Sequence, residues 1–303
     1  MRTEIQDFLL TFQDRMVFQE PLSKHTWFGV GGPADAFFVP SDIQDLKCFL
    51  ETKPKDLPYY ILGGGSNLLV RDGGIRGVVI KLNSPYFQQI LPQKDSLKCF
   101  GGCPNARLKK ILIEHERSGL EFLCSIPGTI GGSVRSNAGC FGSSISDVLI
   151  SADIMDNQGN IKTVGNDWFD FAYRFSDFPQ DCFVLSAVLK TSDGSAQTIQ
   201  NTINEQALYR KIHQPTGVKT AGSTFKNPPS LSAWKLIEQA GCKDFRFGDA
   251  KVSDKHCNFL VNTGNATAED IENLGNAIRN TVQEKTGIQL QWEIQITGQK
   301  NEF

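Results

Sequence analysis

Between about residues 21 and 190 the hydrophobic positions gather in short runs that are separated by glycine-rich turns. Runs of this length, bounded by turn residues, are typical of β-strands. The runs that predict strands lie at 36–40, 59–62, 78–81, 96–101, 148–156 and 182–190. Apolar residues recur instead at helical spacing in 42–52 and 107–118, which predicts a helix in each segment. This mixture indicates an α+β fold.

The pattern changes after a linker that we expect near residues 191–197. One helix is predicted at 233–240, and a second is predicted after the capping box Thr267-Ala-Glu-Asp270. From 288 to 296 apolar residues alternate strictly with Gln and Glu, which predicts a strand with one apolar and one polar face. The C-terminal part therefore also has an α+β pattern.

The composition of the 303 residues is that of a globular protein, with a formal net charge of −2 and no basic stripe that would indicate nucleic-acid binding. No apolar stretch is long enough to span a bilayer, so we expect no membrane insertion. Residues 1–19 mix charged and apolar side chains, which predicts a short amphipathic helix rather than a signal peptide. The eight cysteines are scattered and form no CxxC pair, so we expect reduced thiols, a cytoplasmic protein and no metal site.

Three glycine-rich loops, 28–33, 62–67 and 126–133, stand out along the chain. Consecutive glycines allow backbone N–H groups to converge on phosphate oxygens, because no Cβ blocks the approach and positive φ is accessible. The alternative is that each loop is only a tight turn. The sequence contains no GxxxxGK[ST] loop, and Gly29-Val-Gly31 meets the dinucleotide pattern GxGxxG only at its start. The loops together predict a diphosphate-containing ligand that is bound without the usual nucleotide motifs.

Several segments resemble the motifs of the UDP-N-acetylenolpyruvoylglucosamine reductase family. They are HTWFGVGGPA at 25–34, LGGGSNLLV at 62–70, IPGTIGG at 126–132 with NAG at 137–139, YRFS at 173–176, AGSTFKNP at 221–228, VSxxHxNF at 252–259 and WEI at 292–294. The block at 221–228 is the most specific of them. The likeness extends from about residue 22 to residue 298 and is to the shorter subtype of the family, which has no tyrosine lid.

The resemblance implies a vanillyl-alcohol-oxidase-like (PCMH-type) FAD-binding domain at 20–195 and a smaller C-terminal substrate-binding domain at 200–303. It implies a bacterial enzyme of peptidoglycan precursor synthesis that uses FAD and NADPH to reduce UDP-N-acetylglucosamine enolpyruvate to UDP-N-acetylmuramate. We expect the FAD to be non-covalent, because the loop at Gly63 lacks the histidine that tethers flavin in some enzymes of this fold class. The only partner implied is the small-molecule substrate. The oligomeric state stays open, and a monomer is compatible with the sequence.

The resemblance also assigns three catalytic residues: Ser223 as the proton donor, Arg174 against the developing carboxylate charge, and Glu293 in the same cleft. Taken alone, each has a simpler interpretation, namely a turn serine, a surface cation and a solvent-facing glutamate. The cofactor-binding residues implied are Gly63, Gly64, Gly65, Ser66, Asn67, Pro127, Gly128, Thr129, Gly132, Asn137 and Gly139. The substrate-binding residues implied are Tyr173, Lys226, Asn227 and His256.

Some residues have no role assigned by the resemblance. Arg135 stands where relatives commonly have bulkier apolar or aromatic residues, and Arg210 and Lys211 fit either a ligand contact or a solvated helix face. The strongest rival function is another PCMH-type FAD oxidase or dehydrogenase acting on a sugar or hydroxy acid. A second rival is a nucleotide-sugar-binding protein without activity. The block at 221–228, with Arg174 and Glu293, favours the reductase over both.

Overall fold

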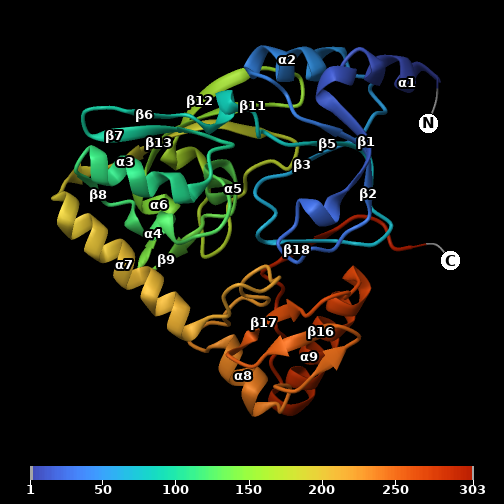
Figure 1. Ribbon diagram of the computed structural model, residues 1–303, viewed down its shortest axis with the longest axis vertical. Coiled ribbons are helices and arrows are strands. Elements are labelled where there is room, and N and C mark those ends of the chain that lie inside the picture. The colour runs from blue at the N-terminus through green and yellow to red at the C-terminus, as the bar shows by residue number, and fades with distance from the viewer. Residues whose placement is uncertain (1–2, 302–303) are drawn as a thin grey trace. The chain divides into compact units, whose positions relative to one another are not determined.

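The computed structural model describes residues 3–301 and confirms the α+β fold (Figure 1). Internal contacts divide the chain into two compact units, each built from segments that are not adjacent in sequence. Unit 1 comprises Met1–Phe18, Ala36–Gly64 and Gly77–Leu208, and unit 2 comprises Gln19–Asp35, Gly65–Arg76 and Tyr209–Phe303. The contacts thus group two early segments, 19–35 and 65–76, with the C-terminal residues. The predicted division into an FAD-binding domain at 20–195 and a substrate-binding domain at 200–303 stays a prediction.

The first sheet has four strands in the order β1-β2-β5-β3. Their bounds are Met16–Pro21 for β1, Pro33–Phe38 for β2, Ile75–Ile80 for β5 and Tyr59–Ile61 for β3. In unit 1 these strands share a buried cluster with α1 (Thr3–Leu10) and α2 (Ile43–Thr52). The rings of Phe12, Phe38 and Phe49 pack there with centroids 4.8–5.4 Å apart. The helix predicted at 42–52 is confirmed, and the side chain of Asp42 accepts a hydrogen bond from the Asp45 N–H at its start.

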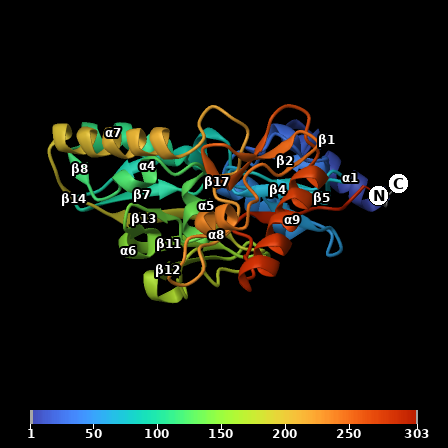
Figure 2. The same cartoon turned by 90° about the horizontal axis from the view of Figure 1, so that it is seen from below.

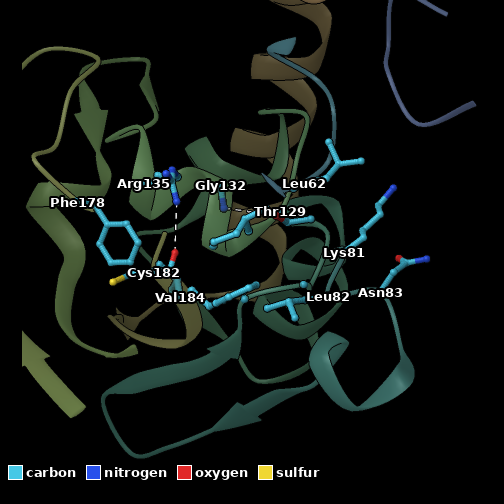
Figure 3. A pocket seen from close by; sticks show the side chains of 16 residues that line it. Leu62, Lys81, Leu82, Asn83, Thr129, Gly132, Arg135, Phe178, Cys182 and Val184 are labelled. Atoms are coloured by element: carbon cyan, nitrogen blue, oxygen red, sulfur yellow. Dashed lines mark hydrogen bonds between the residues drawn. The ribbon is translucent and has the colours of Figure 1, made fainter. Parts of the chain in front are cut away.

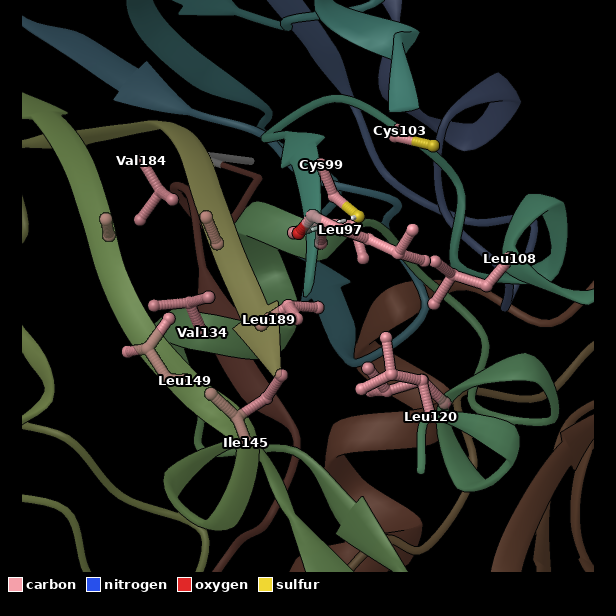
Figure 4. Packing of buried hydrophobic residues seen from close by; sticks show 14 of the residues in the cluster. Leu97, Cys99, Cys103, Leu108, Leu120, Val134, Ile145, Leu149, Val184 and Leu189 are labelled. Carbon is pink, nitrogen blue, oxygen red and sulfur yellow. Dashed lines mark hydrogen bonds between the residues drawn. The ribbon is translucent and has the colours of Figure 1, made fainter. Parts of the chain in front are cut away.

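The second sheet of unit 1 has five antiparallel strands in the order β12-β11-β13-β7-β6. Their bounds are Ile161–Gly165, Leu149–Met155, Phe183–Lys190, Ser96–Phe100 and Ile90–Pro92, in the same order. Four short helices pack on it: α3 (Leu108–Glu114), α4 (Glu121–Cys124), α5 (Ile130–Arg135) and α6 (Ile145–Val148). Figure 4 shows apolar side chains of strands and helices, among them Leu97, Val134 and Leu149, in one buried cluster. The strands predicted at 96–101, 148–156 and 182–190 are confirmed to within two residues.

The helix predicted at 107–118 is too long. α3 ends at Glu114, and Glu116 takes a φ of +49°, which a right-handed helix excludes. The next two residues form β8 (Arg117–Ser118), which pairs with β14 (Ser192–Asp193). The predicted linker at 191–197 therefore contains a strand and the first residues of a helix.

That helix, α7 (Ala196–His213), was not predicted. Only two of its side chains, Ile199 and Ile203, are buried. A helix of this kind has no apolar stripe long enough to be recognised from hydrophobic spacing.

Unit 2 contains a three-stranded sheet in the order β15-β16-β17, with bounds Arg246–Phe247, Ala250–Ser253 and His256–Asn262. Figure 2 shows α8 (Ala233–Gln239) and α9 (Ala268–Thr286) beside β17, and their apolar side chains form one cluster with it. The predicted capping box is confirmed. Thr267 accepts from the Asp270 N–H at 3.0 Å, and the Asp270 carboxylate accepts from the Thr267 N–H at 2.9 Å.

The continuous strand predicted at 288–296 is wrong. Within this segment only β18 (Gln295–Thr297) forms a strand, which pairs in parallel with the three-residue β4 (Leu68–Val70), and Trp292 forms an isolated bridge with Phe225. The alternation of faces is nevertheless real. Leu290 and Ile294 are 0% and 3% exposed, whereas the glutamines at 289, 291 and 295 are exposed.

The remaining elements are short. β9 (Gly139–Cys140) pairs with β10 (Ser143–Ser144), and 3-10 turns lie at Gln13–Arg15, Leu22–Lys24, Pro85–Gln88, Asn105–Arg107 and Asn166–Trp168. Within residues 3–301 no helix is both long and apolar enough to cross a membrane.

Candidate active site

Three glycine-containing turns of unit 1 meet backbone to backbone around a pocket (Figure 3). Gly63 and Gly64 follow β3, and Gly128 precedes α5. A Cβ on Gly64 would lie 2.6 Å from the Cα of Gly128, so only glycine permits this approach. The third turn, which follows β7, joins through the Gly131 N–H, which donates to the carbonyl of Gly101 at 2.8 Å.

The turns leave hydrogen-bond donors available. Across residues 3–301 the backbone amides of Gly63, Gly64 and Gly102 donate to no protein acceptor. Thr129, at the start of α5, accepts from the Gly132 N–H at 3.4 Å, and both residues line the pocket. Backbone N–H groups without a protein acceptor, two of them on pocket residues, and a surface without Cβ atoms suit an anionic or carbonyl-rich ligand. Of the predicted cofactor residues, Gly63, Thr129 and Gly132 thus line the pocket, while Gly64, Pro127 and Gly128 lie on the turns that shape it.

Arg135, which had no assigned role, lines the same pocket. Its guanidinium lies 5.5 Å from the ring centroid of Phe178, and its Nη1 donates to the carbonyl of Cys182 at 3.3 Å. Burial lowers the pKa of Arg135, and it also lowers the pKa of Lys81, which lines the pocket too. Two partly desolvated cations therefore favour an anionic ligand. The sequence reasoning missed Lys81 and the doublet Gly101-Gly102, although a glycine doublet at the end of a predicted strand was a usable signal.

Arg174 lies in a two-residue turn of unit 1. The backbone of Ala172 and Phe175 exchanges two hydrogen bonds, of 3.0 and 3.1 Å, across the turn. Arg174 takes a φ of +55°, an uncommon value for a residue other than glycine, and its guanidinium lies 5.2 Å from the ring centroid of Tyr173. The Tyr173 ring is 56% exposed. The turn therefore presents an aromatic ring and a cation on one exposed loop.

Asn137 and Gly139 have partners within the protein. Asn137 is buried, and its side-chain amide bonds the backbone on both sides, at Ala172 and Ser146. A Cβ on Gly139 would lie 2.6 Å from the carbonyl oxygen of Ser143, so this glycine allows the β9–β10 pairing. Both residues thus shape the backbone beside α5 and the turn of Arg174.

Unit 2 brings Ser223 and Glu293 together, whereas Arg174 belongs to unit 1. Ser223 follows Gly222, whose φ is +80°, and forms an isolated bridge with Phe259. The next residue, Thr224, is fully buried, and its carbonyl accepts from the Glu293 N–H at 2.9 Å. One backbone hydrogen bond therefore fixes the distance between the chain segments that carry the serine and the glutamate.

The loop at 65–67 supports this arrangement. Asn67 donates from Nδ2 to the carbonyl of Glu293 at 3.0 Å, and its own carbonyl accepts from the Gln295 N–H. Gly65 takes a φ of +65°, and a Cβ there would lie 1.9 Å from the carbonyl oxygen of His25. Ser66 lies between these two residues in unit 2. The loop predicted to hold the cofactor is thus also a support for Glu293.

The predicted substrate residues of unit 2 lie on either side of this segment. The Lys226 N–H donates to the carbonyl of Gln291 at 2.9 Å, and Asn227 accepts from the Ala233 N–H at the start of α8. In His256, Nδ1 lies 3.2 Å from the Asn258 N–H and accepts from it, so the neutral ring carries its proton on Nε2. Burial lowers the pKa of His256, which favours this neutral form.

Comparison with known proteins gives the same assignment over nearly the whole chain. The family models "FAD binding domain" and "UDP-N-acetylenolpyruvoylglucosamine reductase, C-terminal domain" match residues 34–165 and 214–297. The UDP-N-acetylenolpyruvoylglucosamine reductase of Paramagnetospirillum magneticum is 46% identical over 97% of this chain and 95% of its own length. The enzyme of the same name from Rickettsia typhi is 45% identical over 91% of this chain and 93% of its own.

A solved structure agrees with these relatives. The crystal structure of UDP-N-acetylenolpyruvylglucosamine reductase from Thermus caldophilus superposes with a TM-score of 0.80 at 33% identity, covering 93% of this chain and 97% of that one. The FAD-binding fold that the resemblance implied is therefore confirmed, and the relatives favour the reductase over the oxidase alternative. The chain belongs to the UDP-N-acetylenolpyruvoylglucosamine reductase family.

Proposed function

We propose that this chain reduces the enolpyruvyl double bond of UDP-N-acetylglucosamine enolpyruvate to give UDP-N-acetylmuramate, with Ser223, Arg174 and Glu293 as the catalytic residues. FAD is the cofactor and NADPH the reductant. The observation that carries the residue assignment is the hydrogen bond from the Glu293 N–H to Thr224, which holds the serine and the glutamate on adjoining segments. The reaction belongs to peptidoglycan precursor synthesis and consumes a UDP-sugar and NADPH, so a cytoplasmic location is part of the proposal.

The cofactor site that we propose is the glycine pocket of unit 1. The unpaired amides of Gly63, Gly64 and Gly102 fit the oxygens of a diphosphate or a flavin, and the guanidinium of Arg135 adds positive charge beside them. The flavin is held without a covalent bond. When bound, it supplies the hydride chemistry, which no side chain of the protein can provide. The remaining predicted contacts, including Ser66 and Pro127, stay predictions.

The protein must manage the charge that the reduction creates. Adding hydride to the methylene carbon of an enolpyruvyl group pushes electron density into its carboxylate. A guanidinium can meet both carboxylate oxygens, and we assign this role to Arg174. The anion formed by this addition then needs a proton at the α-carbon to become the product. We propose that the O–H bond of Ser223 breaks as this C–H bond forms, and that solvent later returns the proton to the serine. Glu293, held beside that segment, supports the transfer.

Ser223→Ala separates the two half-reactions and tests this assignment. Proton donation is needed only after hydride has reached the substrate, so we expect NADPH to bleach the flavin of the variant at the normal rate. Reoxidation by the enolpyruvyl sugar nucleotide should slow by about 10²–10⁴-fold, the usual effect of losing a positioned general acid. Ser223→Cys should restore part of this rate. Anaerobic stopped-flow absorbance follows each half-reaction separately.

Ser232→Ala is the matched control, because Ser232 precedes α8 in the same unit and its side chain makes no capping hydrogen bond. This control should behave as the wild type in both half-reactions. Equal slowing of both halves in Ser223→Ala would show that the serine only shapes the site. Unaffected reoxidation would assign the proton to another group, of which Glu293 is the first candidate.

A further inference from the structure

The turn that carries Arg174 is tied to the C-terminal end of α5 at two points. Before the turn, the carbonyl of Ala172 accepts from Nδ2 of Asn137 at 2.9 Å. After the turn, Oγ of Ser176 donates to the carbonyl of Arg135 at 2.7 Å. Both anchors stand at the end of one six-residue helix, and the five-residue segment 172–176 is held at both of its ends.

The side-chain amide of Asn137 uses both its oxygen and its nitrogen in hydrogen bonds within the protein. It is 5% exposed, its Oδ1 accepts from the Ser146 N–H at 3.0 Å, and its Nδ2 donates to the turn. Its backbone takes a φ of +45°, a conformation that asparagine tolerates better than most residues. Asparagine supplies a donor and an acceptor on two separate atoms, whereas an ionised aspartate cannot donate and alanine can do neither. These contacts account for the asparagine without any contact to the cofactor.

Arg174 needs such support for two reasons. Its φ of +55° lies in the sparsely populated left-handed region, and such a conformation persists only where the surroundings enforce it. The guanidinium also stands at the end of a long, flexible side chain, so a small rotation of the turn moves it far. The two anchors remove that rotation.

We infer that Asn137 and Ser176 are positioning residues, which act on the reaction by fixing the backbone of the Ala172–Phe175 turn and thereby the guanidinium of Arg174. The inference rests on the role proposed above for Arg174. It also changes the expected role of Asn137, which the sequence motif placed among the cofactor contacts. Thr129 caps the start of α5, Gly132 lies in its first turn, and both residues line the pocket. One short helix therefore supports the cofactor pocket at its start and the turn of the catalytic arginine at its end.

The test compares Asn137→Ala, Ser176→Ala, Arg174→Lys and the double variant Asn137→Ala/Arg174→Lys in the FAD-loaded protein. We expect each single variant to slow flavin reoxidation by the enolpyruvyl substrate by about 10–100-fold, the range for a catalytic group misplaced by about 1 Å. The FAD dissociation constant and the NADPH half-reaction should stay within about twofold of wild type. The double variant should react within about twofold of Arg174→Lys alone, because residues that act through one another are not additive.

Asn166→Ala is the matched control. Nδ2 of Asn166 donates to the carbonyls of Ser146 and Leu149 at 2.7 and 2.9 Å, so it bonds the same neighbourhood as Asn137 but not the turn. This variant should keep both half-reactions at the wild-type rate. If Asn137→Ala fails to fold, Ser176→Ala decides alone, since the Ser176 hydroxyl makes one partly buried hydrogen bond to the helix end.

Three outcomes would overturn the inference. A tenfold weaker FAD affinity in Asn137→Ala, with both half-reactions slowed, would make Asn137 a cofactor contact. Multiplicative losses in the double variant would show that it does not act through Arg174. If Arg174→Lys is slow but Ser176→Ala and Asn137→Ala reoxidise normally, the two residues have no positioning role, and the role of the arginine stands. Normal reoxidation in Arg174→Lys would instead refute the role proposed for the arginine itself.

Discussion

Replacing Gly64 with alanine should separate the two glycine turns that form the pocket. The added Cβ would lie 2.6 Å from Cα and 3.1 Å from the carbonyl carbon of Gly128. Unbonded carbons rest about 3.5–4.0 Å apart, so the turns must part by roughly 1 Å. Both neighbours are backbone atoms, and no rotamer change relieves the contact. Overpacking of this kind costs about 1–3 kcal/mol, against a gain of about 0.4–1 kcal/mol from the less flexible unfolded chain.

Gly63→Ala provides the matched control. Its Cβ would meet Oγ1 of Thr129 at 3.5 Å and Cα of Gly132 at 3.9 Å, which are ordinary contacts, and neither Gly63 nor Gly64 has a positive φ. The two variants share the unfolded-state effect, so their difference isolates the approach of the turns. We expect Gly64→Ala to unfold several degrees below Gly63→Ala, since 1 kcal/mol shifts the midpoint by about 2–4 °C in a domain of this size class. The assay is thermal unfolding of the FAD-free protein by circular dichroism. Equal midpoints would refute the close approach of the turns.

Two further predictions concern other contacts. Arg135→Met should raise the FAD dissociation constant about tenfold or more, because charge-assisted hydrogen bonds contribute about 1.5–3 kcal/mol. Quenching of flavin fluorescence measures this constant, and Lys110→Met, which changes an exposed lysine, is the control. An unchanged constant in Arg135→Met would remove the arginine from the cofactor site. Gly275→Ala should lower the free energy of unfolding by about 1–3 kcal/mol, although alanine has the better helix propensity. The added Cβ would lie 2.0 Å from Cη2 of Trp292, and the centroid of that ring lies 5.0 Å from the ring centroid of Phe225. Urea unfolding measures this loss, and adding Trp292→Leu should reverse it; a stabilised single variant would contradict the packing of α9 on this ring.

The parts of the fold that could be predicted are those with a local signal. The capping box at Thr267 is a short-range hydrogen-bond pattern, and the helix at 42–52 has a local spacing of apolar residues; both are present as expected. The wrong predictions depend on distant partners. The segment 288–296 has the alternation of a strand but meets a strand partner of only three residues. Residues 117–118 were predicted to be helical and instead pair with residues 192–193. Periodicity records which face is buried and not which segment lies beside it.

The same limit applies to the site. The family resemblance named Asn137 as a cofactor residue, which stays a prediction, and the pattern Asn-Ala-Gly gave no sign that its amide bonds Ala172 and Ser146, which are 35 and 9 residues away. Asn67 likewise bonds the carbonyl of Glu293, 226 residues along the chain. A sequence motif identifies important positions, but it does not identify the atoms that their side chains contact. Long-range hydrogen bonds of this kind become visible only in the folded chain.

The three glycines at 63–65 show why a turn and a ligand cradle need not be alternatives. Gly64 is required by the backbone of Gly128, and Gly65 by the carbonyl of His25, so both satisfy the simpler interpretation of a tight turn. Gly63 has room for a Cβ, lines the pocket and has an N–H that donates to no acceptor among residues 3–301. Packing therefore explains the absence of a Cβ at two glycines of the run, and it does not explain the third. An alanine at Gly63 should thus disturb FAD binding more than stability, and one at Gly64 should disturb stability first.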